Sequence, residues 1–368
     1  MKLPTKIASG ILIVLALGIF SLAILLSQTD ACVAAPQLST DTTSMKAVVS
    51  RCYGSPDTLS YEDIAKPTPA EHEVLVKVHA ASVNPLDWHG MRGSPYFMRL
   101  SSGLGTPSDS RFGVDFAGVV EAVGAAVTQY KPGDEVFGGR SGAFAQYLII
   151  PEDRALAHKP DNMSFEQAAA VPIAAISALQ ALRDKGKIKP GQKVLINGAS
   201  GGVGTFAVQI AKSFGAEVTG VCSTRNVDMV RSIGADHVID YKQEDYTKTG
   251  LRYDLIIDNV GNHSPLANRR ALTAEGKLVI VGGGSGNWLG PMLVPLQAVL
   301  LSPFVEQELG LMLAYLKATD LATLGELMQA GKLTPVIDKR FTLQEVPAAI
   351  RYSETGRARG KIVVNLVE

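Results

Sequence analysis

Apolar residues in the second half of the chain form short uninterrupted runs that alternate with segments of helical periodicity. The first expected strand starts at Val194. The others are Glu217–Cys222, His237–Tyr241, Asp254–Val260 and Lys277–Val281. Helices are expected between them, for example at 226–233 and 265–272. Continuous apolar runs are typical of strands that helices cover on both faces. The pattern therefore predicts an α/β fold with a doubly wound parallel sheet.

The first half of the chain, after residue 44, contains short β-like runs separated by turns. Gly54-Ser55-Pro56 and Lys131-Pro132-Gly133-Asp134 are typical turn sequences. The expected strands are Met45–Ser50, Val74–Val83, Phe116–Val123, Glu135–Phe137 and Phe144–Ile150. These runs predict an all-β domain of irregular barrel type that precedes the α/β domain. A chain of 368 residues is long enough for two hydrophobic cores.

A glycine-rich turn, VLINGASGGVG (194–204), joins the first α/β strand to a helix. Gly198 allows a tight turn, Gly201 lets the backbone approach a phosphate, and Gly204 lets helix and strand pack closely. The free N–H groups of the helix N-terminus favour an anion. In this context the turn predicts a dinucleotide pyrophosphate site. Its residues are Gly198, Ser200, Gly201, Gly202, Val203 and Gly204.

The residues after the next strand indicate which dinucleotide binds. An NAD site usually carries an Asp or Glu there for the ribose, whereas this chain has Ser223, Thr224 and Arg225. A guanidinium and two hydroxyls suit a 2′-phosphate, so we expect NADP(H) rather than NAD(H). A solvated loop arginine is the alternative for Arg225. Further cofactor residues are expected at later strand ends, namely Tyr241, Val260 and Gly282.

Several motifs, in order, resemble one protein family from Met45 to the C-terminus. They are ASVNPLDW (81–88), GVDFAGVV (113–120), YKPGDEVFG (130–138), LINGASGGVGTFAVQIAK (195–212), VTGVCSTRN (218–226) and GRARGKIVV (356–364). The chain resembles the zinc-free quinone oxidoreductase branch of the medium-chain dehydrogenase/reductase superfamily. This resemblance implies a GroES-like catalytic domain (45–165), a Rossmann NADP-binding domain (166–304) and a C-terminal segment (305–368) that completes the catalytic domain.

The resemblance also allows a test for catalytic zinc. Zinc members need cysteine and histidine ligands, but this chain has Asn84-Pro85-Leu86-Asp87 and Gly113-Val114-Asp115 at those places. We therefore expect no metal. The expected chemistry is transfer of a hydride to a quinone or an α,β-unsaturated carbonyl, which conjugation already polarises.

Two residues are candidates for the catalytic site. The resemblance puts Asn84 beside the nicotinamide, where an amide can donate a hydrogen bond to a developing oxyanion. Asp87 is a weaker candidate. A turn residue before Pro85 is an equal alternative for Asn84, because Asn is common in turns. A second function stays open, namely a membrane-tethered NADPH-binding or scaffold protein without turnover.

Residues 1–44 form a separate region of membrane anchor or signal, followed by a linker. Ile7–Leu26 is 20 residues long without a charge, which is enough to span a bilayer as a helix. This length favours an uncleaved single-pass anchor, while small residues at 31–35 allow a cleaved signal as the alternative. Three cysteines, Cys32, Cys52 and Cys222, are not expected to form a disulfide framework.

Two observations disagree on which side of the membrane the catalytic domain lies. Lys2 and Lys6 before the anchor favour an inside N-terminus and an outside catalytic domain, whereas NADPH is expected inside. A translation start at Met45 would make the protein cytoplasmic, and an organelle membrane is another resolution.

Two further apolar segments and the overall charge complete the expectations. Prolines interrupt 288–304, so this segment is not a second span; it lines the acceptor pocket, forms a homodimer contact or touches lipid. Residues 306–330 have helical spacing. The 35 basic and 35 acidic residues balance, which argues against a nucleic-acid partner.

Overall fold

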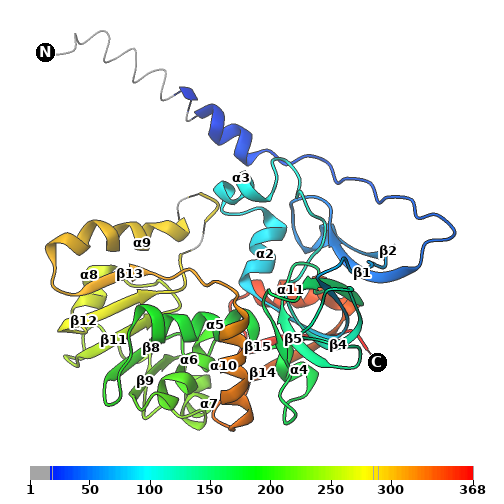
Figure 1. The fold of residues 1–368 in the computed structure, drawn as a ribbon. Coiled ribbons are helices and arrows are strands. Elements are labelled where there is room, and N and C mark those ends of the chain that lie inside the picture. The colour runs from blue at the N-terminus through cyan, green and yellow to red at the C-terminus, as the bar shows by residue number, and fades with distance from the viewer. Residues whose placement is uncertain (1–16, 19, 285, 289, 368) are drawn as a thin grey trace, which may run out of the picture.

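The computed structural model describes residues 17–18, 20–284, 286–288 and 290–367. A six-stranded parallel sheet forms the body of one lobe, in the order β10-β9-β8-β11-β12-β13 (Figure 1). In a doubly wound sheet of this order, the crevice in which ligands bind lies at the carboxyl ends of β8 and β11, where the winding direction reverses. The strands are β8 (Lys193–Asn197), β9 (Glu217–Cys222), β10 (His237–Asp240), β11 (Tyr253–Asp258), β12 (Leu272–Ile280) and β13 (Glu308–Leu311).

The continuous apolar runs of these strands supply two cores, one on each face of the sheet. In β8, Val194 and Ile196 join the core beneath α5 and α6, while Leu195 joins the core that contains Ala298 of α9. Alternate side chains of a strand point to opposite faces, so a strand buried on both sides must be apolar throughout. The helices of this lobe are α5 (Pro172–Gln180), α6 (Gly202–Ser213), α7 (Val227–Ser232), α8 (Pro265–Arg269), α9 (Gly290–Leu301) and α10 (Ala318–Gln329).

The other lobe is built on a seven-stranded sheet in the order β14-β15-β3-β4-β5-β7, with β6 paired to β3. The C-terminal strand β15 pairs with β3, so the end of the chain returns to the lobe formed by its first half. A separate hairpin pairs β1 with β2. The elements are β1 (Ser44–Ser50), β2 (Leu59–Ala65), β3 (Glu73–Val83), β4 (Asp115–Val123), β5 (Glu135–Gly139), β6 (Tyr147–Pro151), β7 (Leu156–His158), β14 (Ile337–Thr342), β15 (Lys361–Asn365), α2 (Pro85–Arg92), α3 (Arg99–Ser102), α4 (Phe165–Ala169) and α11 (Val346–Glu354).

Two segment predictions are corrected by the structure. Residues 306–330 are not one helix: 308–311 form the edge strand β13, and the helix α10 begins at Ala318. The six-stranded sheet therefore continues beyond the predicted domain boundary at 304. Of the three prolines in 288–304, Pro295 does not break the segment, because α9 runs through it, whereas Pro291 lies in the first turn of α9 and Pro303 lies beyond its end.

The N-terminal region differs from the prediction in one covalent bond. Cys32 and Cys52 form a disulfide, although the presence of three cysteines does not predict a disulfide. This bond joins the linker to the lobe built on the seven-stranded sheet, which we call the β-lobe. Residues 7–16 and 19 of the predicted anchor lie outside the described part of the chain, and 20–27 are helical. Among the described residues, no helix has both the length and the apolar character needed to cross a bilayer.

Candidate active site

The glycine-rich turn connects β8 to α6 with the backbone that its sequence demands. Gly198 has a φ of +77°, which L side chains rarely adopt. A Cβ on Gly204 would lie 2.1 Å from the carbonyl oxygen of Gly198, so only glycine lets the helix approach the turn this closely. A Cβ on Gly201 would meet no protein atom nearer than 3.6 Å, so the turn is open on that side. Together with the first N–H groups of α6, this opening fits a phosphate.

The loop after β9 lies beside the turn, as the α/β pattern predicts. Ser223 is buried, while Thr224 and Arg225 are exposed. Asn226, which the sequence pattern does not single out, connects the two loops because its Nδ2 donates to Ser200 Oγ at 2.9 Å. Its Oδ1 is buried and has no hydrogen-bond partner among the described residues. A ribose hydroxyl would satisfy such an acceptor.

Residues 223–226 contain no carboxylate, but the fold brings one from another strand to this loop. Asp240, at the end of β10, accepts a hydrogen bond from Thr224 Oγ1 at 2.6 Å. That bond, followed by those from the Lys242 N–H and the Gln243 side chain, lowers the pKa of Asp240. Asp240 is therefore ionised at neutral pH. The loop after β9 itself contains no carboxylate that would face a 2′-phosphate. Asp240, at the end of β10, nevertheless brings one to this loop.

A second cationic group accompanies Arg225 at this end of the cleft. The Arg225 guanidinium donates to the carbonyl oxygen of Arg357 at 2.7 Å, so the C-terminal loop 356–360 lies against the β9 loop. Arg359 follows in the same loop, and its buried Nε has no hydrogen-bond partner in the described part of the chain. The positive charges here come from two segments far apart in sequence.

The remaining predicted cofactor residues lie at the carboxyl ends of other strands. Tyr241 and Val260 are 53% and 43% exposed. A Cβ on Gly282 would lie 2.0 Å from the carbonyl oxygen of Asn259, so the ends of β11 and β12 pack closely. Fully buried Asp258 accepts hydrogen bonds from the N–H groups of Val260 and Gly261 and thereby fixes the floor of the crevice.

Asn84 and Asp87 sit together at the start of α2. Asn84 precedes the helix, and Asp87 Oδ2 accepts its backbone N–H at 2.7 Å, which is a typical first-turn contact. Both residues are almost fully buried, at 2% and 4% exposure. The other oxygen of Asp87, Oδ1, has no partner among the residues described.

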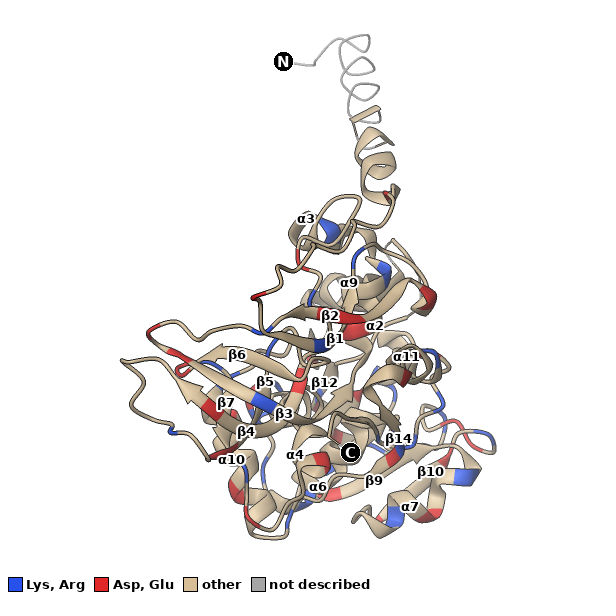
Figure 2. Ribbon diagram, turned by 90° about the vertical axis from the view of Figure 1, so that its right-hand side faces the viewer, with Lys and Arg blue, Asp and Glu red and all other residues tan. Residues whose placement is uncertain are grey.

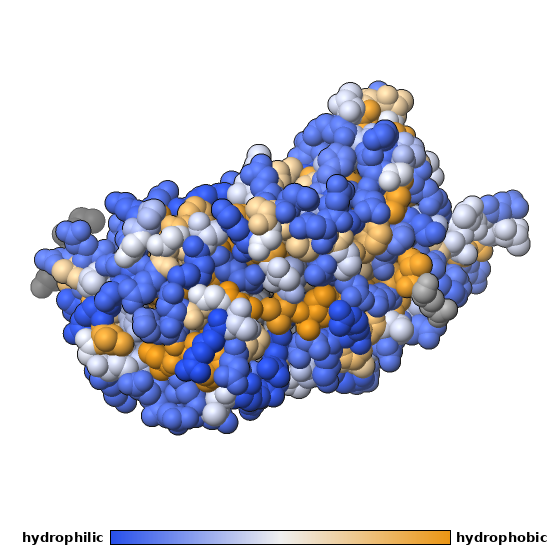
Figure 3. Space-filling view, turned by 90° about the horizontal axis from the view of Figure 1, so that it is seen from below, coloured by the Kyte–Doolittle hydropathy of each residue, from blue (hydrophilic) through white to orange (hydrophobic). Residues whose placement is uncertain are grey.

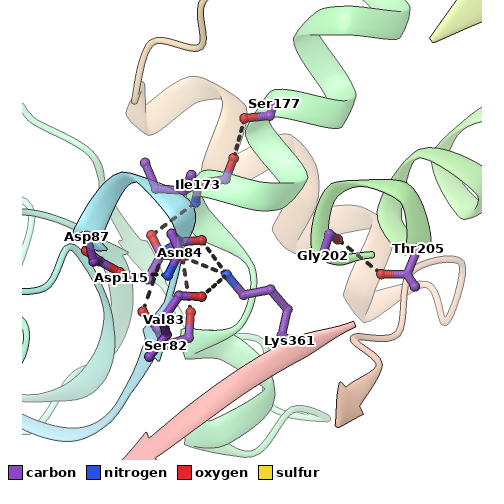
Figure 4. A network of polar contacts seen from close by, with 10 residues as sticks. All are labelled: Ser82, Val83, Asn84, Asp87, Asp115, Ile173, Ser177, Gly202, Thr205 and Lys361. Atoms are coloured by element: carbon purple, nitrogen blue, oxygen red, sulfur yellow. Dashed lines mark hydrogen bonds and ion pairs between the residues drawn. The ribbon is translucent and has the colours of Figure 1, made fainter. Parts of the chain in front are cut away.

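Two residues that the sequence pattern missed complete this cluster, Asp115 on β4 and Lys361 on β15 (Figure 4). Asn84 Nδ2 donates to Asp115 Oδ2 at 2.9 Å, and Lys361 Nζ donates to Asn84 Oδ1. Lys361 Nζ also lies 3.3 Å from the carbonyl oxygen of Val83 and 3.5 Å from Asp115 Oδ2. The amide of Asn84 is thus engaged at both ends. Both residues fall within the family motifs, but their spacing of 246 positions gives no signal that they meet.

Burial dominates the electrostatics of the cluster. It raises the pKa of Asp87 to about 7, with the carboxylate of Asp115 adding to the shift and the Asn84 N–H opposing it. Burial also raises the pKa of Asp115, against the attraction of Lys361, and lowers the pKa of Lys361. A charge held away from water is costly unless it is paired, and Asp115 and Lys361 pair with each other.

Lys361 also links this cluster to the phosphate turn. The preceding residue, Gly360, donates its N–H to the carbonyl oxygen of Ser200 at 3.0 Å. A Cβ on Gly202 would lie 3.4 Å from Lys361 Cδ, so the lysine stem passes the start of α6. Figure 4 shows Lys361 reaching from β15, between α6 and the Asn84 loop. The turn and the Asn84 cluster therefore belong to one site.

The donor set beside Asn84 does not suit zinc. Its members are an amide, two carboxyls and an ammonium, and the ammonium of Lys361 would repel a divalent cation. Within the described residues, no three His, Cys, Asp or Glu side chains gather in a way that could hold a metal ion.

Family models match both lobes. Residues 70–161 match the alcohol dehydrogenase GroES-like domain, and residues 233–364 match the zinc-binding dehydrogenase domain. The words 'zinc-binding' describe the family that the second model represents. In this chain, the cluster around Asn84 lacks the donors that zinc prefers.

Three known proteins are similar over most of the chain. The mitochondrial NAD(P)H oxidoreductase RTN4IP1 of Bos taurus is 34% identical over 362 residues, covering 88% of this chain and 90% of that protein. The trans-enoyl reductase pgmF of Aspergillus terreus is 36% identical and covers 80% and 87% of the two chains. The solved structure of the quinone oxidoreductase from Coxiella burnetii superposes with a TM-score of 0.78 at 31% identity, covering 88% of this chain and 100% of that one.

Proposed function

The chain belongs to the medium-chain dehydrogenase/reductase superfamily, and from this premise we propose that it is an NADPH-dependent, zinc-independent reductase of quinones or α,β-unsaturated carbonyls. Its relatives make it an oxidoreductase of the quinone or enoyl reductase type that uses a nicotinamide cofactor. The observation that carries the finer proposal is the single site in which Lys361 joins the phosphate turn to the Asn84 cluster.

Each part of the site has a distinct task in this proposal. The turn 198–204 and the N-terminus of α6 hold the pyrophosphate, and the β9 loop with Arg225 holds the 2′-phosphate. When bound, the reduced nicotinamide supplies a hydride. An acceptor that takes up a hydride develops negative charge on its oxygen, and solvent then supplies the proton.

The cluster around Asn84 stabilises that developing charge. Lys361 places a positive charge on this side of the cleft, and Asn84 and Asp115 fix its position by accepting its hydrogen bonds. Because the Asn84 amide is engaged at both ends, we assign it to positioning Lys361 rather than to donating directly to the acceptor. A buried, fixed charge is effective because it needs no reorganisation during the reaction.

A steady-state assay tests the proposal. The purified full-length chain is given NADPH with a panel of quinones and enones, and oxidation is compared with the acceptor-free blank. We expect turnover with at least one class and a loss of at least tenfold in kcat for Lys361→Met. Lys339→Met, an exposed lysine on the adjacent strand β14, is the matched control and keeps full activity. Saturable NADPH binding without any oxidation above the blank would instead favour the scaffold function.

Membrane attachment through 7–26 is part of the proposal. The charge-free run and its flanking lysines support it. Carbonate extraction of membranes from cells that express the full chain tests it: an anchored chain stays in the pellet, and an unanchored one is released.

A further inference from the structure

The helix α9 is apolar on its exposed side as well as on its buried side. Pro295 and Ala298 are buried, and Ala298 packs in the core beneath the sheet, while Leu296, Val299 and Leu300 are 45%, 61% and 72% exposed. Residues 278–305 contain no charged side chain at all. A surface helix of a soluble domain normally turns a polar face to water. The exposed side of α9 therefore suits a non-aqueous environment.

A second apolar group lies at α3 and the loops beside it. Phe97, Leu100 and Leu104 are 43%, 65% and 48% exposed. The only charged residue between 93 and 108 is Arg99, and its side chain is buried at 2% exposure. Its guanidinium lies over the ring of Tyr53 and donates to the carbonyl oxygen of Gly93 at 2.8 Å. The segment 93–108 thus exposes no charged side chain of its own.

The N-terminal segment is fixed to the β-lobe at this same place. Leu26 is buried, and Arg99 donates to the carbonyl oxygen of Gln28. The Asp30 N–H donates to the carbonyl oxygen of Gly105 at 3.0 Å. The Cys32–Cys52 disulfide holds the linker a few residues further on. The charge-free run that begins at Ile7 therefore joins the folded protein beside α3.

The α3 and α9 regions also meet each other. The Tyr96 N–H donates to the carbonyl oxygen of Asn287 at 2.7 Å, and the rings of Tyr96 and Trp288 pack edge to face at 4.8 Å. Figures 1 and 2, which view the molecule from directions 90° apart, both place α3 and the N-terminal helix at one end, with α9 next to them. Three largely apolar segments from distant parts of the sequence thus gather there.

The face at the opposite end of the molecule has a different character. Figure 3 shows this face, which is seen from below relative to Figure 1. Hydrophilic residues cover most of it, and hydrophobic residues show mainly in a band across its middle. The two ends therefore differ in the way expected of a protein with one end in lipid and the other in water.

We propose that the end formed by α3, α9 and the N-terminal helix lies on a lipid bilayer. The lipid-facing surface consists of Phe97, Leu100, Leu104, Leu296, Val299 and Leu300. A bilayer fits better than a second copy of the chain because the surface is continuous with the segment that has the length and composition of a membrane anchor. Because 93–108 expose no charged side chain and 278–305 contain none, these segments favour contact with the acyl chains rather than attraction to anionic headgroups.

Contact of this surface with a bilayer would give an acceptor dissolved in the lipid a short route to the active site. This consequence rests on the proposed function. Asn84 precedes α2, and the far end of α2 leads to the α3 region. Eight helical residues span about 12 Å. The Asn84 cluster is therefore one short helix away from the lipid-facing surface.

Environment-sensitive labels on the full-length chain test the surface. Cys222 is buried and the other two cysteines are paired, so an introduced cysteine is the one reactive thiol among the described residues. Leu100→Cys and Leu300→Cys, labelled with nitrobenzoxadiazole, are reconstituted in phosphatidylcholine vesicles. Leu251→Cys is the matched control, because Leu251 is 56% exposed in a loop between Lys248 and Arg252.

We expect emission from both surface labels to rise several-fold and shift to shorter wavelength on adding vesicles, while the Leu251 label is unchanged. Water-like emission from both surface labels in chains that float with the vesicles would overturn the proposal, since the anchor would then merely tether the protein. Emission that rises with protein concentration without lipid would also overturn it and assign the surface to a second copy. Neither result affects the NADPH oxidation assay, so the reductase proposal is judged separately.

Discussion

Arg225 and Asp240 present opposite charges to the part of the cleft that decides cofactor preference. Arg225 would attract a 2′-phosphate, and ionised Asp240, hydrogen-bonded to the neighbouring Thr224, would repel it. An exposed guanidinium is screened by solvent and salt, so its contribution is smaller than that of a buried one. The balance between the two charges is open to a direct measurement.

Replacing Arg225 by alanine is expected to raise the KM for NADPH several-fold and to leave the KM for NADH almost unchanged. A hydrogen bond to a charged group contributes about 1.5–3 kcal/mol at most, and exposure reduces this value. Asp240→Asn is the converse variant, because removing the negative charge should lower the KM for NADPH. Steady-state kinetics with both cofactors measures the changes. Equal effects of Arg225→Ala on the two cofactors would show that the residue does not read the phosphate.

Asp87 makes folding stability depend on pH. Its pKa in the folded protein is about 7, against an ordinary value of 3.8, because burial disfavours the carboxylate. Between these values the folded state holds a proton that the unfolded state has lost, so the free energy of unfolding falls as pH rises from about 4 to about 7. Each pKa unit corresponds to about 1.4 kcal/mol, which sets an upper limit of about 4 kcal/mol.

The variant Asp87→Asn removes this proton while keeping an oxygen for the Asn84 N–H. We expect its free energy of unfolding to fall less than that of the wild type between pH 5 and pH 8, as measured by urea denaturation. Asp109→Asn, a change at an exposed carboxyl paired with Arg111, is the control. Parallel pH profiles for Asp87→Asn and the wild type would refute the assignment.

At the scale of single residues, the sequence pattern singled out the turn and Asn84 but not the partners of Asn84. Glycine at 198 and 204 is dictated by local backbone geometry, which a local pattern can reveal. The contacts of Asn84 with Asp115 and Lys361 depend on the pairing of β3 with β4 and β15. Likewise Asp240 reaches Thr224 only because β10 pairs with β9. Periodicity does not encode such tertiary pairings.

The loop 356–360 contacts the phosphate turn and leads directly to Lys361. Gly360 has a φ of +98°, and a Cβ on it would lie 2.2 Å from the carbonyl oxygen of Val336. Alanine there must displace the backbone that carries Lys361 and that donates to Ser200. Gly356, in the same loop, has a φ of +64°, but a Cβ on it would have no described neighbour within 4 Å.

Comparing Gly360→Ala with Gly356→Ala therefore separates backbone strain from steric overlap. Alanine at a positive φ costs about 1 kcal/mol, which is the expected loss for Gly356→Ala. Gly360→Ala should lose clearly more stability and should also lower kcat, since Lys361 moves. Thermal unfolding and NADPH oxidation measure the two effects. Equal losses in both variants would contradict the close packing of Gly360.

Among the elements, strands were easier to predict than the segments after residue 282. The range predicted for β9 agrees with the structure, and those for β1, β3, β4, β10 and β11 differ only at their ends, because turns bound each apolar run. The spacing at 306–330 also suits a helix, but pairing with β12 makes 308–311 a strand. In α9, Pro295 is accommodated within the helix. Tertiary contacts overrode the local preference in both cases.

At the scale of the whole molecule, the linker is fastened to the β-lobe by a covalent bond as well as by Arg99. Cys32 lies in a linker without periodicity, so nothing in the sequence showed that it meets Cys52. Disulfides persist in oxidising compartments. The bond is therefore expected to persist where the catalytic domain faces an oxidising compartment.

Reduction of this disulfide is expected to lower the thermal stability of the full chain. The bond joins residues 20 positions apart, and closing a loop of that length contributes about 3 kcal/mol in the chain-entropy model. A reductant should therefore lower the Tm of the wild type by several degrees. The double variant Cys32→Ser/Cys52→Ser should start at the lower Tm and not respond to the reductant, because Cys222 is unpaired and buried. An unchanged Tm for the wild type under full reduction, verified by alkylation and mass spectrometry, would show that the noncovalent contacts of Leu26 and Arg99 alone hold the linker.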